Sequence, residues 1–221
     1  MVLDYPEDHP VQRLHRRIVA DPAAPALDFE LEIQVRQACR LPIGLHPTFR
    51  LQPGDDLHLE PGSYDHVRTF PGTVEAGASL FLPDERFDRL DRAPTRSGGT
   101  LDATRLPLDQ DVEDLLQLVG TGGHVGLHFG REGYVARLSW QPEHFPSLLF
   151  WFSNRGRAAF PWNGKHLALG VEPICSAFDL GPAISTASNP IAESGFPTAI
   201  ELDPSSPFIT RYRLEVSSRT T

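Results

Sequence analysis

The chain has 221 residues and a formal net charge of −9, and 40% of its residues are hydrophobic. This is the composition of a globular protein that is long enough to bury a continuous core without cross-links. The acidic balance argues against nucleic-acid binding, which needs a basic face for the phosphates. No segment approaches the roughly 20 apolar residues of a membrane-spanning helix.

Cysteine usage and the first residues favour a cytoplasmic location. Cys39 and Cys175 are the only cysteines, and they are far apart in the sequence with no CxxC spacing. A disulfide framework or a cysteine zinc site is therefore not expected. Residues 1–8 are acidic and lack the apolar core of a secretion signal.

Short strands are predicted along the whole chain. Side chains alternate between apolar and polar without a fault over residues 27–35, which is typical of a half-buried antiparallel strand. Residues 208–216 repeat this alternation near the end of the chain. In chain order, strands are expected at residues 11–19, 27–35, 57–60, 125–129, 134–140, 148–152, 167–171 and 208–216.

Helical periodicity is scarce. Residues 87–92 fit one helical turn, whereas residues 111–119 fit either a two-turn helix or a strand. Strands do not alternate with long helices, which argues against a doubly wound α/β sheet. The 18 glycines and 21 prolines are dispersed between apolar runs, as a sheet with many turns requires. We predict a single all-β domain, an antiparallel β-sandwich, over residues 1–221.

Two segments carry candidate catalytic groups. His46 stands before Pro47, which favours an extended backbone, and imidazole exchanges protons near neutral pH. Glu172 follows the apolar run of residues 167–171, where burial would raise its pKa and make it a suitable general base. A structural histidine and a salt-bridged glutamate are the alternatives. His124 and His128 have H-x-x-x-H spacing, but on a strand they lie too far apart to share one metal ion.

The two segments together resemble the aldose 1-epimerase (galactose mutarotase-like) family. His-Pro-Thr-Phe-Arg-Leu at 46–51 is similar to that family's H-x-Y-F-x-L motif, with Thr48 in place of tyrosine. Leu-Gly-Val-Glu-Pro at 169–173 is similar to the late strand that ends in the catalytic glutamate. The resemblance implies a galactose mutarotase-like supersandwich in which Glu172 is the base and His46 the acid, with no metal or organic cofactor.

The resemblance also implies a binding site for a small-molecule sugar or sugar phosphate. The family uses a further carboxylate, for which Asp111 is the best match and Glu113 the near alternative. Trp162, with Trp151 and Phe160, offers an aromatic face for a sugar, and Asn163 beside it is a further expected contact. Arg155 and Arg157 provide planar donors for hydroxyls or a phosphate. A solvated surface or core role is the alternative for each of these side chains.

The N-terminal region departs from the family pattern. Only 45 residues precede His46, so we expect a sandwich shortened at the N-terminus. The family has an arginine and a second histidine upstream of its first motif, and His9, His15 and Arg17 are the available stand-ins. An aldose 1-epimerase and a non-catalytic sugar-binding module therefore remain the main alternatives, with a carbohydrate-modifying lyase or hydrolase as a third. A homodimer is compatible with either.

Overall fold

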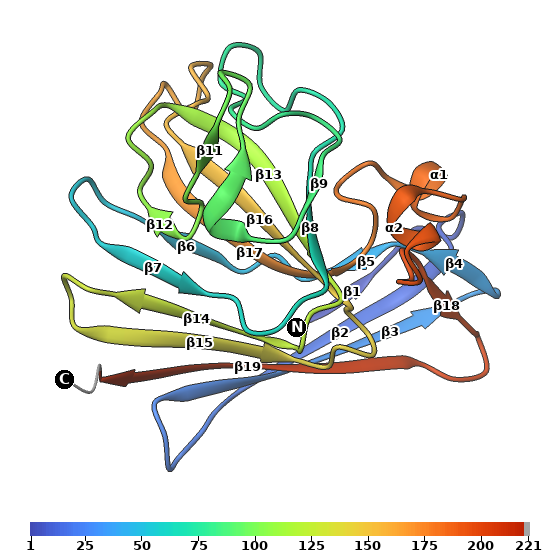
Figure 1. The fold of residues 1–221 in the computed structure, drawn as a ribbon. Coiled ribbons are helices and arrows are strands. Elements are labelled where there is room, and N and C mark those ends of the chain that lie inside the picture. The colour runs from blue at the N-terminus through green and yellow to red at the C-terminus, as the bar shows by residue number, and fades with distance from the viewer. Residues whose placement is uncertain (219–221) are drawn as a thin grey trace.

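Two antiparallel sheets form the body of the molecule. The computed structural model describes residues 1–218, and Figure 1 shows the two sheets as stacked layers. The eight-stranded sheet consists, in spatial order, of β1 (Val2–Asp4), β2 (Val11–Ala20), β3 (Ala26–Val35), β19 (Phe208–Ser218), β15 (Tyr134–Trp140), β14 (His124–Phe129), β7 (Leu57–Glu60) and β12 (Arg105–Leu106).

The second layer is a seven-stranded sheet. It consists of β5 (Ile43–Gly44), β17 (Leu167–Cys175), β16 (Ser147–Asn154), β13 (Val112–Val119), β8 (His66–Thr69) and β9 (Arg86–Phe87), and β6 (Thr48–Arg50) also pairs with β17. Two small two-stranded sheets pair β10 (Ala93–Pro94) with β11 (Thr100–Leu101) and β4 (Cys39–Leu41) with β18 (Ile200–Leu202). The helical elements are η1 (Leu90–Arg92), α1 (Pro182–Ser185) and α2 (Pro190–Glu193).

The structure confirms the predicted antiparallel β-sandwich. The alternation in β3 and β19 survives in their pairing, where Phe208 faces Ile33 and Tyr212 faces Phe29 across the two strands. Within residues 111–119, which fitted a helix or a strand, Val112–Val119 form strand β13, and every residue of that strand is buried. A strand with both faces covered has no polar side to display, so its sequence periodicity could not distinguish the two structures.

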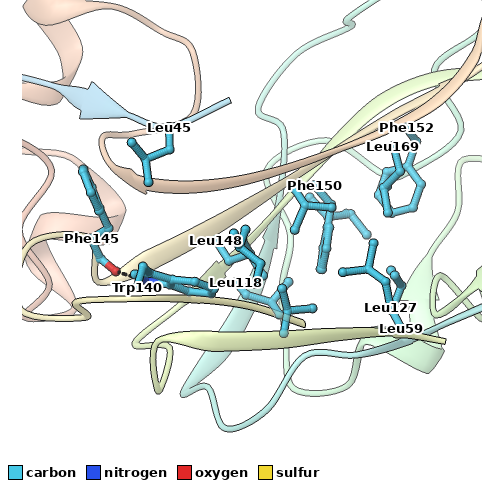
Figure 2. Packing of buried hydrophobic residues seen from close by; sticks show 14 of the residues in the cluster. Leu45, Leu59, Leu118, Leu127, Trp140, Phe145, Leu148, Phe150, Phe152 and Leu169 are labelled. Carbon is cyan, nitrogen blue, oxygen red and sulfur yellow. Dashed lines mark hydrogen bonds between the residues drawn. The ribbon is translucent and has the colours of Figure 1, made fainter. Parts of the chain in front are cut away.

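The main core lies between the two sheets. Side chains from the inner face of the seven-stranded sheet pack against those of the eight-stranded sheet, as Figure 2 shows. Trp140 is buried with them, and its indole nitrogen donates a hydrogen bond to the carbonyl of Phe145 at 2.9 Å. The buried residues labelled in that view include Leu59, Leu118, Leu127, Leu148, Phe150, Phe152 and Leu169.

A second apolar cluster covers part of the outer face of the seven-stranded sheet. Leu115, Leu149 and Ile174 on the strands pack under Phe178 and Ile191 from the segment that carries α1 and α2. The side-chain amide of Gln117 ties this segment down. It donates to the Ser176 carbonyl at 2.9 Å and accepts from the Phe178 amide at 2.8 Å. The rest of the outer face lies outside this cluster and carries polar side chains.

Two further features of the fold concern membrane spans and cysteines. Among residues 1–218, no helix has the length and apolarity needed to cross a membrane. Cys39 and Cys175 are both free thiols.

Replacing Phe150 with alanine tests the core. Phe150 is fully buried, so Phe150→Ala should lower the free energy of unfolding by about 3–5 kcal/mol, through lost burial and the cavity left behind. Urea denaturation measures this loss. The matched control is Phe160→Ala, because the Phe160 side chain is 84% exposed. Equal stability of the two variants would contradict this assignment of the core.

Candidate active site

Backbone pairing places His46 directly opposite Glu172. In the antiparallel register, Gly44 of β5 faces Ile174 of β17, and Thr48 of β6 faces Gly170. The residues that flank His46 continue this register, since the Leu45 amide donates to the Pro173 carbonyl and the Val171 amide donates to the Pro47 carbonyl, both at 2.9 Å. Opposed residues on neighbouring strands point to the same face with Cβ atoms roughly 5 Å apart. The two side chains are therefore brought together by the sheet itself.

The two side chains meet in one cleft. The Nε2 atom of His46 lies 3.3 Å from Oε1 of Glu172, and the Glu172 side chain is 10% exposed whereas that of His46 is 62% exposed. Nδ1 of His46 lies 3.0 Å from the Thr48 hydroxyl, which orients the ring. Both groups line a cleft of about 260 Å³ whose other lining residues include Leu149, Ser176 and Asp179. We call this the His46–Glu172 cleft.

The cleft changes the acidity of its carboxyl group. Burial raises the pKa of Glu172 to about 8, and the charge of Asp179 in the same cleft adds to the rise. A carboxylate with this pKa is a stronger base than an exposed glutamate. It exchanges a proton readily near neutral pH, which is the requirement for a general base.

A glycine makes room for the carboxylate. A Cβ atom on Gly170 would collide with Oε1 of Glu172 and would lie 2.9 Å from Cβ of Trp151. Gly170 lies between Thr48 on one neighbouring strand and Trp151 on the other. The absence of a side chain at this position lets the Glu172 carboxylate lie over the strand.

A second buried carboxylate lies further along the same face. Glu113 on β13 is completely buried, and it accepts hydrogen bonds from the Trp151 indole nitrogen at 2.5 Å and from the Ser153 hydroxyl at 3.0 Å. Nε of Arg157 lies 3.0 Å from the same carboxylate. The Ser153 hydroxyl is also 2.7 Å from Nδ1 of His166. These contacts satisfy the buried charge of Glu113 and hold it in one orientation.

Aromatic rings border the polar groups. The ring centroids of His46 and Trp151 are 5.7 Å apart in an edge arrangement, and those of Trp151 and His166 are 5.8 Å apart. The guanidinium of Arg157 lies 5.5 Å from the Trp151 ring centroid and 5.0 Å from that of Trp162. Trp151 is thus the aromatic side chain nearest the centre of this face.

The remaining predicted site residues lie at the edge of the same region. Asp111 is 70% exposed, and its carboxylate accepts from Nε of Arg155 at 2.8 Å. Asn163 has a positive φ of 50° in the turn after β16, and its side chain donates to the Pro161 carbonyl at 3.2 Å. Trp162 contacts Arg157 rather than the His46–Glu172 cleft.

Sequence reasoning did not single out Ser153 and His166, and it placed Glu113 second to Asp111. A signal for Ser153 was present, because it lies two residues after Trp151 and therefore on the same face of β16. Glu113 and Gln117 are four residues apart on β13, so their side chains point to the same face of the sheet, and this was a comparable signal for Glu113. His166 gave no such signal, because it lies just before β17 in a turn.

Two further observations bear on ligands. Among residues 1–218 there is no group of three or more His, Cys, Asp or Glu side chains arranged to hold a metal ion. A larger cavity of about 470 Å³ lies on the other side of His46, lined mainly by apolar side chains such as Phe29, Leu31 and Leu214. It does not include Glu172, so the smaller His46–Glu172 cleft is the better candidate for proton-transfer chemistry.

The fold is that of the galactose mutarotase-like proteins, as several solved structures show. A candidate aldose 1-epimerase from Escherichia coli K12 superposes with a TM-score of 0.64 at 15% identity, over 98% of this chain and 64% of the other. Galactose 1-epimerase from Lactobacillus acidophilus NCFM gives 0.62 at 18%, over 99% and 62%. A galactose mutarotase-like protein from Lactobacillus casei ATCC 334 gives 0.58 at 16%, over 98% and 68%.

The likeness concerns the fold rather than the sequence. No family model matches the chain, and no curated protein matches it in sequence. The chain spans 64% of the length of the Escherichia coli structure and 62% of that of the Lactobacillus acidophilus enzyme. The resemblance inferred from the motifs around His46 and Glu172 is therefore confirmed at the level of the fold.

The raised pKa of Glu172 predicts a pH-dependent stability difference. Between its ordinary value of 4.5 and its folded value of about 8, the folded protein holds a proton that the unfolded chain has released. Wild-type stability therefore falls as pH rises through this window, whereas Glu172→Gln has no proton to lose there. We expect the variant's advantage in free energy of unfolding to grow from about pH 5 to about pH 8 in urea denaturation.

Asp91→Asn is the control for this measurement. A hydrogen bond from Arg89 lowers the pKa of Asp91, so that carboxylate is already ionised in both states across the same window. No growing difference is expected for it. A flat difference for Glu172→Gln as well would show that Glu172 is not held in a desolvating site.

Proposed function

We propose that the protein is an aldose 1-epimerase, which interconverts the α and β anomers of a sugar. The observation that carries the proposal is the 3.3 Å approach of His46 and Glu172 in one cleft. Anomer exchange through the open-chain aldehyde needs one group that removes a proton and one that supplies a proton. Imidazole and a carboxylate of raised pKa are suited to these two tasks.

The proposed steps conserve atoms and electrons. The Glu172 carboxylate removes the proton of the anomeric hydroxyl, the bond between C1 and the ring oxygen breaks, and the ring oxygen takes a proton from the His46 imidazolium. The aldehyde then turns half a rotation about the C1–C2 bond. Ring closure returns the protons to their original groups, so the net change is only the configuration at C1.

The sugar must enter between groups that touch in the free protein. Glu172 is held rigidly in a buried strand, whereas His46 is 62% exposed, so in this proposal the imidazole moves and the carboxylate remains in place. Displacement of the imidazole then leaves room for the sugar ring beside the Glu172 carboxylate, with Trp151 beside its apolar C–H face. Glu113 is the carboxylate proposed to act on sugar hydroxyls through Ser153 and Arg157, because it is itself completely buried.

A non-catalytic sugar-binding module is the second candidate. It is favoured by the position of the residues expected to replace the family's upstream arginine and histidine. His9, His15 and Arg17, the expected stand-ins for the family's upstream residues, do not line the His46–Glu172 cleft. Two free thiols are compatible with a reducing compartment, so a cytoplasmic location is part of either proposal.

Anomer exchange measured by NMR saturation transfer tests the proposal. The wild-type protein should accelerate exchange of glucose, galactose or their phosphates, and Glu172→Gln and His46→Ala should each reduce kcat/KM by about 10²–10⁴-fold, the usual contribution of a proton-transfer group. Glu60→Gln and His128→Ala are matched controls, because they disrupt a Glu–His contact of 2.7 Å on the other sheet. Sugar binding without any exchange would favour the binding module.

The pH profile is a separate prediction. Because the base must be ionised and the acid protonated, kcat/KM should follow a bell-shaped pH profile, and the raised pKa of Glu172, about 8, moves the rising limb well above the ordinary glutamate range. Anomer exchange measured from about pH 5 to about pH 9, corrected for buffer catalysis, gives the profile. A rising limb centred near the ordinary glutamate value would show that Glu172 is not the ionisation that controls the reaction.

A further inference from the structure

A cationic pocket lies beside the proposed epimerase site. It has a volume of about 450 Å³, and its polar lining residues are Thr48, Arg50, Gln52, Arg155, Lys165 and His166. We call this set the cationic pocket. No aspartate or glutamate lines it, although the chain carries a net charge of −9. Lys165 is the only lysine of the sequence, so its position in this pocket is distinctive.

Two of the positive charges are available to a ligand. Within residues 1–218, neither Arg50 nor Lys165 has a carboxylate within ion-pair distance, whereas most of the exposed arginines of this acidic protein do. The third cation, Arg155, is paired with Asp111, which is 70% exposed. The pocket thus combines two unpaired cations with a third whose partner lies mostly in solvent.

Strand register connects the cationic pocket with the His46–Glu172 cleft. Arg50 faces Ala168 across β6 and β17, whereas Thr48, which contacts His46, faces Gly170. Ala168 and Glu172 point to the same side of β17 and are separated by roughly 13 Å along the strand. Gly170 lies midway between them on the same side of the strand. A sugar lying along this side with its anomeric carbon at Glu172 would direct its other end toward Arg50.

We propose that the cationic pocket binds the phosphate of a sugar monophosphate, so that the substrate is a phosphorylated aldose. This rests on the epimerase function proposed above. Arginine and lysine are the usual phosphate ligands in proteins, because they form charge-assisted hydrogen bonds with its oxygens. The phosphate must lie at the end of the sugar opposite C1, as in a hexose 6-phosphate. A 1-phosphate is excluded because it has no free anomeric hydroxyl for Glu172 to deprotonate.

Calorimetric binding of a sugar that cannot be epimerised tests the pocket independently of catalysis. The probes are 1,5-anhydroglucitol 6-phosphate, which lacks the anomeric hydroxyl, and unphosphorylated 1,5-anhydroglucitol. The wild-type protein should bind the phosphate at least tenfold more tightly. Arg50→Ala and Lys165→Ala should each weaken its binding by about tenfold, the typical value of a charge-assisted hydrogen bond. Arg137→Ala, which removes an exposed strand arginine from the other sheet, is the control and should not change it.

Anomer exchange of glucose 6-phosphate and glucose completes the test. We expect the ratio of kcat/KM between the two sugars to favour the phosphate and to fall about tenfold in Arg50→Ala and in Lys165→Ala. If both sugars are exchanged and the variants leave the ratio of kcat/KM unchanged, the proposed role of the cationic pocket is wrong and the epimerase proposal is unaffected. If the anhydro phosphate binds tightly, the variants weaken this binding, and neither sugar is exchanged, the role of the cationic pocket is supported and the epimerase proposal is wrong. Absence of both binding and exchange would overturn both.

Discussion

The candidate site depends on one backbone register. Strand β17 pairs with β5 before His46 and with β6 after it, and the amides and carbonyls of residues 45, 47, 171 and 173 continue the pairing through the gap. This fixes His46 opposite Glu172, on the face of the sheet that points away from the core. A shift of one residue would turn one of the two side chains into the apolar interior.

The same face of the sheet carries two buried carboxylates, Glu113 and Glu172. Burying a carboxylate without a partner is costly, and the two carboxylates of this face are stabilised differently. Glu113 receives hydrogen bonds from Trp151 and Ser153 and an ion pair from Arg157. Glu172 has the exposed imidazole of His46 at 3.3 Å, and burial raises its pKa. The first arrangement suits a fixed binding group and the second a group that exchanges protons.

Coverage of the outer face decides where a ligand can lie. The segment carrying α1 and α2 packs on Leu149 and Ile174, while Gln117 anchors its start, so that this part of the face is closed. The His46–Glu172 cleft and the cationic pocket lie on the same sheet beyond this segment, at opposite ends of β17. Both proposals therefore concern one continuous strip of a single sheet.

The sequence by itself determined the sandwich, most of its strands, and the motifs around His46 and Glu172, because period-two alternation and turn residues are local properties. It left residues 111–119 undecided, since a strand buried on both faces loses its alternation. Tertiary structure alone decided that Glu113, rather than Asp111, lies buried among Trp151 and Arg157, and that Arg50 and Lys165 share a pocket. These are contacts between strands distant in the chain, and their register depends on long-range packing that local patterns do not contain.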